Sequence, residues 1–208
     1  MRKLLLLTFT LMCIVFTQGQ SQANDIKTVK ATIVKHAIEM GVDPAIALSI
    51  ARAESGFRHD AKSCYGAVGV FQLMPATARR MGLNPYSLND NIRGGIMYYK
   101  KMYSMFGSME LALAAYNAGP GNVKKYNAVP PFGETKRFVS KIMIDYNNQK
   151  INPDPAIVNA RKQAELMAKP KVVAPTPVAE KDAKDLIKIE IIDQKPLDIK
   201  IEAETIAI

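Results

Sequence analysis

"AIALSIARAESGFRHD", residues 45–60, changes from an apolar segment to a charged one and carries Glu54 at the junction. The pair Asp43–Pro44 stands before it as an N-cap residue and a first helical residue, so the pattern predicts a helix over 45–54. Glu54 lies four residues beyond Ile50 and therefore on the same helix face as that apolar side chain. The acid thus continues an apolar stripe, where a carboxylate is costly to bury.

An acid at this position is a candidate general acid. Removal from water disfavours the charged form of a carboxyl group, which raises its pKa and keeps it protonated near neutral pH. The alternative is a structural glutamate that makes a hydrogen bond at the end of its helix. The stretch by itself leaves both interpretations open for Glu54.

Other residues with nucleophilic or metal-binding chemistry are few. His36, His59 and Cys64 do not have the spacing of a metal site, and His59 lies in a charged segment unsuited to a Cys-His nucleophile. The glycines of "GAVGVFQ", residues 66–72, do not sit between a strand and a helix, as a dinucleotide-binding loop requires. We therefore expect neither a metal nor a cofactor.

The hydrophobic periodicity of the chain predicts a mainly α fold. Helices are expected over 26–40, 45–54, 75–82, 87–107, 109–119, 121–127 and 134–148. The segment 56–73 has glycines at three positions and is expected to form a loop or a small β element. Gly94 and Gly95 interrupt a predicted helix at a cost of roughly 1 kcal/mol each, and close packing against another backbone is the expected reason.

The two ends of the chain differ from its middle in composition. Residues 1–23 combine Arg2 and Lys3, an apolar run of 13 residues and small residues before a cut after Ala23, which is typical of a secretory signal peptide. An uncleaved anchor is the alternative, but the run is short for a bilayer, and we expect no membrane span after cleavage. Residues 24–150 are predicted to form one mainly helical domain. Residues 151–208, rich in Pro, Lys and Ala, are predicted to be an extended linker and tail, disordered or partner-docking.

The charge of the chain suggests an anionic partner. The formal net charge is +9, and most of it falls within residues 24–150. A basic domain is suited to nucleic acid, a membrane surface or an acidic polymer. Export to the periplasm argues against nucleic acid and favours a polymer of the cell envelope.

Three motifs then occur in order, with two further segments around them. They are "ESGF" at 54–57, "GAVGVFQLMPATA" at 66–78 and "LALAAYNAGPGNV" at 111–123, with "NIRGGIMYY" at 91–99 and "ETKRFV" at 134–139. Over about residues 30–146 the chain resembles the lytic transglycosylases of the soluble (SLT, family 1) type, which have a goose-lysozyme-like fold. One departure is Val70-Phe71, where the family usually has Leu-Met before Gln72.

The resemblance implies a reaction that needs one carboxyl group. Glu54 would protonate the glycosidic oxygen between MurNAc and GlcNAc in peptidoglycan. The same group, now a base, would take the proton of the MurNAc 6-hydroxyl, which closes a 1,6-anhydro ring. No water is consumed, so no second carboxylate is required, unlike in most glycosidases. Asp60 and Glu134 are the runner-up carboxylates and are interpreted as solvated charges.

The resemblance also implies supporting residues. Ser63 matches a serine that hydrogen-bonds the catalytic acid. Gln72 and Met74 match residues that line the sugar sites around the scissile bond. Tyr116 and Asn117 match the pair that orients the acid and the sugar N-acetyl group.

Two alternatives to transglycosylation stay open at this point. One is a hydrolytic muramidase that uses water, and the other is a catalytically idle wall-binding module of an envelope assembly. The small size of the chain resembles enzymes that open the wall locally for a secretion, conjugation or pilus system. In that case the tail at 165–208 would dock a partner in the machine.

Overall fold

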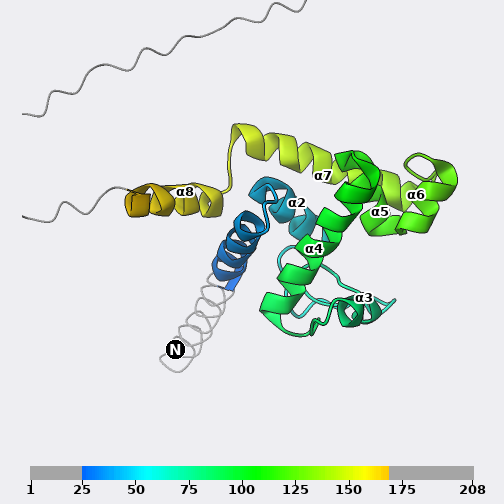
Figure 1. Ribbon diagram of the computed structural model, residues 1–208, viewed down its shortest axis with the longest axis horizontal. Helices are drawn as coiled ribbons and strands as arrows, with labels where there is room; N and C mark the ends of the chain where they lie inside the picture. The colour runs from blue at the N-terminus through cyan, green and yellow to red at the C-terminus, as the bar shows by residue number, and fades with distance from the viewer. Residues whose placement is uncertain (1–24, 169–208) are drawn as a thin grey trace, which may run out of the picture. The chain divides into compact units, whose positions relative to one another are not determined.

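The starts of several helices follow capping residues of the sequence. Figure 1 shows how the helices are arranged. The protein is seen in a computed structural model that describes residues 25–168, of which 25–39 form the first helical segment. Helix α2 (Pro44–Glu54) begins where expected, because the Asp43 carboxylate accepts the Ala45 N–H at 2.9 Å and Pro44 fills the first helical position.

The remaining described helices confirm a mainly α fold. They are α3 (Pro75–Arg80), α4 (Leu88–Phe106), α5 (Met109–Ala118), α6 (Pro120–Tyr126), α7 (Gly133–Ile151) and α8 (Pro155–Ala168). Ser87 and Ser108 cap α4 and α5 through their hydroxyl oxygens. Gly107 ends α4 in the left-handed conformation, with φ of 72°.

Helix α5 packs against three of the other described helices. It contacts α4, α6 and α7, while α2 packs against α7 (Figure 1). The α5 residues 112–115 are alanines around Leu113, all fully buried, and their small side chains let neighbouring helices approach closely. The packing places the C-terminal end of α2 and the start of α7 in one region.

The two consecutive glycines of α4 make room for side chains rather than for a backbone. A Cβ on Gly95 would lie 2.2 Å from Cγ of Phe71, and one on Gly94 would lie 2.6 Å from Cδ2 of Leu73. The prediction of close packing at the glycines is therefore confirmed. The neighbours are side chains of the loop between α2 and α3, and not another backbone as predicted.

That loop, residues 56–74, is the Gly-rich loop of the predicted fold. Its extended pairing within the described residues is limited to two isolated antiparallel bridges, which join Val68 to Lys62 and to Leu73. Val68 and Leu73 exchange backbone hydrogen bonds of 3.2 and 2.9 Å. The loop is therefore compact, and its backbone is held by a few hydrogen bonds between its own residues.

The ordered helices extend past the predicted end of the domain at 150. Asp154 and Pro155 start α8 as Asp43 and Pro44 start α2, with the Asp154 carboxylate accepting the Ala156 N–H at 3.0 Å. Ile157 of α8 is buried in the core. The folded region therefore includes residues 151–168, since α8 has an Asp-Pro cap and packs on the core through buried Ile157 and partly buried Ala156 and Ala160.

Two predictions fall outside the described residues. The signal peptide at 1–23 and the part of the tail from 169 onward both lie there, and both stay predictions. Among residues 25–168, no helix combines the length and apolar character needed to cross a bilayer.

Candidate active site

Glu54 is the last residue of α2, and its side chain is partly buried. Within residues 25–168 its carboxyl group has no hydrogen bond or ion pair. Burial, and then the negative charge of Glu134, raise the pKa of Glu54 from an ordinary 4.5 to about 8. The group is thus protonated at neutral pH, as expected of a general acid.

The residues after Glu54 turn the chain sharply out of the helix. Gly56 and Phe57 both have positive φ, 63° and 71°, which is rare for a bulky residue such as Phe57. Ser55 holds this turn, because its hydroxyl donates to the Val70 carbonyl at 2.8 Å and accepts the Arg58 N–H at 3.1 Å. The "ESGF" motif therefore ends α2 and fixes the chain to the loop through Ser55.

Three helices each hold the loop through one side chain. Ser55 follows α2 and binds the Val70 carbonyl, and Asn91 of α4 donates to the Val68 carbonyl at 2.8 Å. Tyr116 of α5 donates its phenolic proton to the Phe71 carbonyl at 2.9 Å. We call these three side chains the loop anchors. Together they fix the backbone of the loop that follows Glu54.

Tyr116 lies close to the acid. Burial raises the pKa of Tyr116 well above its usual range, and the charge of Glu54 raises it further. The ring makes an edge contact with Tyr98 and stacks on Phe138, at centroid distances of 5.2 and 6.4 Å. Tyr116 is therefore a rigid neutral phenol beside Glu54, which suits the predicted role of orienting the acid.

Gln72 and Met74 lie on the loop beyond its anchored segment. Gln72 has a φ of 45°, and its amide nitrogen donates to the carbonyls of Gly69 and Ala61 at 2.9 and 3.2 Å. The side chain is thereby fixed with its nitrogen turned into the loop. Met74 is exposed at the start of α3. Their contacts with sugar remain predictions.

Ser63 is engaged within its own turn. Its hydroxyl oxygen accepts the Ala67 N–H at 3.0 Å, and its backbone N–H donates to the Ala67 carbonyl at 2.9 Å. Among the described contacts there is no hydrogen bond from Ser63 to Glu54. The Ser63 hydroxyl proton has no acceptor among the described contacts. The predicted hydrogen bond therefore requires this proton to reach the Glu54 carboxyl group in the substrate complex.

Asn117 is positioned by a residue that the sequence did not reveal. The buried Thr135 hydroxyl donates to Oδ1 of Asn117 at 2.8 Å, which leaves the Asn117 amide nitrogen as its free donor. Thr135 follows Glu134 in the first turn of α7. The start of α7 therefore supplies both the charge that acts on Glu54 and the contact that orients Asn117.

The other residues missed in the sequence are Ser55 and Asn91. Both lie inside recognised motifs, but a serine or asparagine at a helix end or within a helix has many possible uses. Asn91 is fully buried, and its Oδ1 also accepts the Phe71 N–H at 2.9 Å. A Cβ on Gly69 would clash with the Asn91 side chain, so this position requires glycine.

Asp60, the other runner-up carboxylate, is exposed and is not among the charges that shift the pKa of Glu54.

Comparison with known sequences agrees with this arrangement. A family model, the transglycosylase SLT domain, matches residues 31–139. A transglycosylase of Enterobacteria phage PRD1 is 31% identical over 130 residues, which are 62% of this chain and 47% of the relative. The soluble lytic murein transglycosylase of Salmonella typhimurium is 33% identical over 49% of this chain and 20% of its own length. The chain thus spans about half the length of the first relative and a fifth of the second.

Solved structures give the same result. An inactive glutamate-to-glutamine mutant of the lytic transglycosylase Slt from Pseudomonas aeruginosa is 35% identical, with a TM-score of 0.52 over 61% of this chain and 25% of that one. The 70 kDa soluble lytic transglycosylase of Escherichia coli is 27% identical, with the same TM-score and coverage. The goose-lysozyme-like helical fold expected from the motifs is consistent with these similarities.

Proposed function

Because this chain belongs to the transglycosylase SLT domain family, we propose that it is a peptidoglycan lytic transglycosylase. Its substrate is the glycan strand, cut at the MurNAc-β-1,4-GlcNAc bond with formation of a 1,6-anhydro-MurNAc end. The relatives named as lytic murein transglycosylases support this substrate.

One observation carries the proposal: Glu54 holds a proton near neutral pH. Its pKa of about 8 means that the acid form predominates where a glycosidic oxygen has to be protonated. The inactivity of the glutamate-to-glutamine mutant of the Pseudomonas enzyme agrees with a reaction that depends on a carboxyl group.

In the proposed reaction Glu54 acts twice. Its proton passes to the glycosidic oxygen as the bond to the MurNAc anomeric carbon breaks, and GlcNAc leaves with a free hydroxyl group. The Glu54 carboxylate then takes the proton of the MurNAc 6-hydroxyl, whose oxygen bonds to the anomeric carbon. Glu54 ends protonated, so each cycle is balanced without water. Tyr116 and Asn117 are proposed to orient the acid and the N-acetyl group.

A second candidate function rests on Glu134. This residue is close enough to Glu54 to raise its pKa, so a second carboxylate does stand near the acid. In a hydrolytic muramidase Glu134 would activate water, and the product would be a reducing MurNAc end. The family of the chain favours transglycosylation, in which Glu134 instead maintains the proton on Glu54.

Digestion of purified sacculi separates these functions. Wild type is expected to release fragments with 1,6-anhydro-MurNAc ends in mass spectrometry, while Glu54→Gln releases almost none. Reducing ends would support the muramidase. Equal lysis by both proteins would contradict the role given to Glu54, and no lysis by wild type would support an idle wall-binding module.

We further propose export to the periplasm through residues 1–23 and a role in local wall opening for an envelope-spanning machine. The composition of both chain ends supports this. Deletion of 169–208, which leaves α8 whole, is expected to preserve lysis of sacculi and to reduce assembly of the machine. Unimpaired assembly would refute docking by the tail, and uncleaved full-length protein in the envelope would refute the signal peptide.

A further inference from the structure

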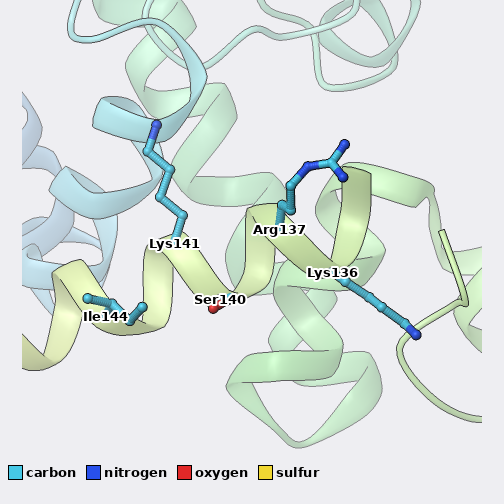
Figure 2. Close-up of a pocket in the computed structure, with 5 residues that line it drawn as sticks. All are labelled: Lys136, Arg137, Ser140, Lys141 and Ile144. Carbon is cyan, nitrogen blue, oxygen red and sulfur yellow. The ribbon is translucent and has the colours of Figure 1, made fainter. Parts of the chain in front are cut away.

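Two cations of this protein lie over one buried aromatic ring. Nζ of Lys30 is 4.9 Å and Cζ of Arg52 is 5.5 Å from the ring centre of Phe57. Three other cations line a hollow of about 500 Å³ on α7 and extend from that helix, and in the described part of the chain none of them lies over a ring (Figure 2): Lys136, Arg137 and Lys141. A cation over the face of a ring is attracted to it and holds the ring in place.

Phe57 needs such support because of its backbone. Its φ of 71° lies in the left-handed region, where the Cβ of a bulky residue is crowded by its own backbone. Gly56 before it also has a positive φ, but glycine carries no Cβ. A strained conformation of this kind persists only where the surrounding structure over-determines it. The buried ring of Phe57 and its two cations therefore help to hold the turn that follows Glu54.

Asp154 holds both cations with one oxygen. Its Oδ2 lies 2.8 Å from Nζ of Lys30 and 3.5 Å from Nη2 of Arg52. The other oxygen, Oδ1, accepts the Ala156 N–H at 3.0 Å and so caps α8. Asp154 is only 8% exposed, so water screens these attractions less than at an open surface. One carboxylate thus fixes the two cations on the ring of Phe57.

Arg52 leaves α2 on the side away from Glu54. Two residues along an α-helix are rotated by about 200°, so these two side chains point in nearly opposite directions. The backbone of the turn closes the same end of the helix, because Gly56 N–H donates to the Arg52 carbonyl at 3.2 Å and Phe57 N–H to the Ala51 carbonyl at 3.5 Å. A shift of the turn therefore moves the last helical turn, which carries Glu54.

We propose that Asp154 is a positioning residue for Glu54. It acts through the two cations over the ring of Phe57: the carboxylate holds the cations, the ring holds the turn, and the turn fixes the end of α2. Both Asp154 and Lys30 lie outside the residues 31–139 that the family model matches. The inference rests on the proposed function, because it concerns the acid of that reaction.

A loosened turn should change the acid in two ways. The carboxyl group of Glu54 is displaced from the glycosidic oxygen, which lowers kcat. Water also gains access to Glu54, whose pKa is raised first by burial and then by the charge of Glu134 on α7. Less burial means a lower pKa for Glu54, while Glu134 and the neutral phenol of Tyr116 on α5 stay as they are.

The test compares the full-length wild type with Asp154→Asn on soluble glycan strands. Asparagine keeps an oxygen that can cap α8 but lacks the charge that holds the cations. We measure kcat and KM for the release of 1,6-anhydro ends on both limbs of the pH profile. Rates are divided by the folded fraction at each pH, seen by circular dichroism, so that lower stability does not count as lower activity. Lys150→Gln, which breaks the exposed pair with Asp43, is the matched control.

We expect Asp154→Asn to lower kcat about tenfold and to change KM by less than about twofold, because a small displacement of the acid acts on the chemical step. Its alkaline limb should move to lower pH, and Lys150→Gln should behave as wild type. Phe57→Leu, which removes the ring, should have a similar effect and add little in the double variant, since both substitutions break one path. Lys30→Gln removes the nearer cation and should change kcat and the alkaline limb in the same direction if Asp154→Asn does not fold.

An unchanged kcat and alkaline limb in folded Asp154→Asn would overturn the proposal. A raised KM at constant kcat would do the same, because it would indicate contact with the substrate, and fully additive effects of Asp154→Asn and Phe57→Leu would refute the path through the ring. Failure of the proposed function is seen separately, as absent 1,6-anhydro ends from wild type. An NMR titration of the Glu54 carboxyl group, assigned with Glu54→Gln, then still decides: Asp154→Asn should lower its pKa, and an equal pKa in both proteins would overturn the proposal.

Discussion

At the scale of the residue, Glu54 makes the protein less stable as the pH rises. Its pKa is higher in the folded state than the ordinary 4.5, so the unfolded chain loses this proton first as pH increases. Between about pH 4.5 and pH 8 the folded state binds more protons, and its stability falls through that window. Holding the proton that the proposed reaction needs therefore lowers the free energy of unfolding at neutral pH.

Glu54→Gln should remove this dependence. We expect the variant to unfold like wild type near pH 4 and to be more stable at pH 8, by on the order of 2–4 kcal/mol. Urea unfolding at the two pH values measures the difference. A wild type and variant that differ equally at both pH values would show that Glu54 does not carry a raised pKa.

The charge of Glu134 gives a second prediction. Removal of a neighbouring negative charge favours the ionised form of Glu54, so Glu134→Gln should lower the pKa of Glu54. The alkaline limb of the pH–activity profile should move to lower pH, with 1,6-anhydro ends still formed at acidic pH. Loss of all activity at every pH would instead assign Glu134 a direct part in the reaction.

Thr135 acts through Asn117 at the same scale. Thr135→Val removes the 2.8 Å hydrogen bond that fixes the Asn117 amide, while Thr135→Ser keeps a hydroxyl in its place. We expect roughly tenfold lower kcat/KM on glycan fragments for the valine variant, close to the loss of one hydrogen bond. The serine variant should retain most of the activity. Equal effects of the two substitutions would point to packing alone.

At the scale of the element, α4 depends on its two glycines. The Cβ of Gly95→Ala would clash with buried Phe71, and the cost of overpacking, about 1–3 kcal/mol, should exceed the gain in helix propensity. Gly121→Ala in α6 meets no atom within 4 Å and is the matched control. Urea midpoints should fall for the first variant and stay or rise for the second. Similar midpoints would contradict the tight contact with Phe71.

The helices themselves were predictable because local signals specify them. Asp43 with Pro44, and the serines before α4 and α5, set helix starts through side-chain hydrogen bonds that involve near neighbours only. Helix α8 was missed although it has the same Asp-Pro start, because its exposed surface offers little apolar periodicity. Only Ile157 is buried there.

The sequence singles out a candidate site residue where its chemistry is unusual for its position, and it does not reveal residues that act through tertiary contacts. Glu54 stands out because an acid on an apolar stripe is rare. The bonds from Asn91 to Phe71 and from Thr135 to Asn117 join residues 18 or more positions apart, and such pairings cannot be read from local spacing. The distant pairing of Glu134 with Glu54 was hidden in the same way.

At the scale of the whole molecule, Asp154 links the first helical segment and α2 to the start of α8. Its nearly buried carboxylate contacts Nζ of Lys30 at 2.8 Å and Nη2 of Arg52 at 3.5 Å, and it caps α8. Lys30 and Arg52 also lie over the ring of Phe57, at 4.9 and 5.5 Å from its centre. A residue beyond the family match thus braces the turn next to Glu54.

Asp154→Asn should accordingly affect the whole unit. Loss of the charge leaves the partly buried Lys30 without its carboxylate partner, while the exposed Arg52 keeps Asp145. We expect a destabilisation of about 2 kcal/mol in urea unfolding. Lys150→Gln breaks the exposed pair with Asp43 and should leave the midpoint nearly unchanged. Equal midpoints for the two variants would show that the Asp154 contacts contribute no more than a surface pair.

The loop anchors have a consequence for how this protein can change over time. Ser55, Asn91 and Tyr116 bind consecutive parts of one loop from three helices, so a substitution at any one of them strains contacts made by the other two. The turn at 63–66, which includes exposed Cys64 and Tyr65, is not held by them. Cys64 and Tyr65 can therefore vary without straining the anchors, while the anchored half of the loop is inherited as a unit.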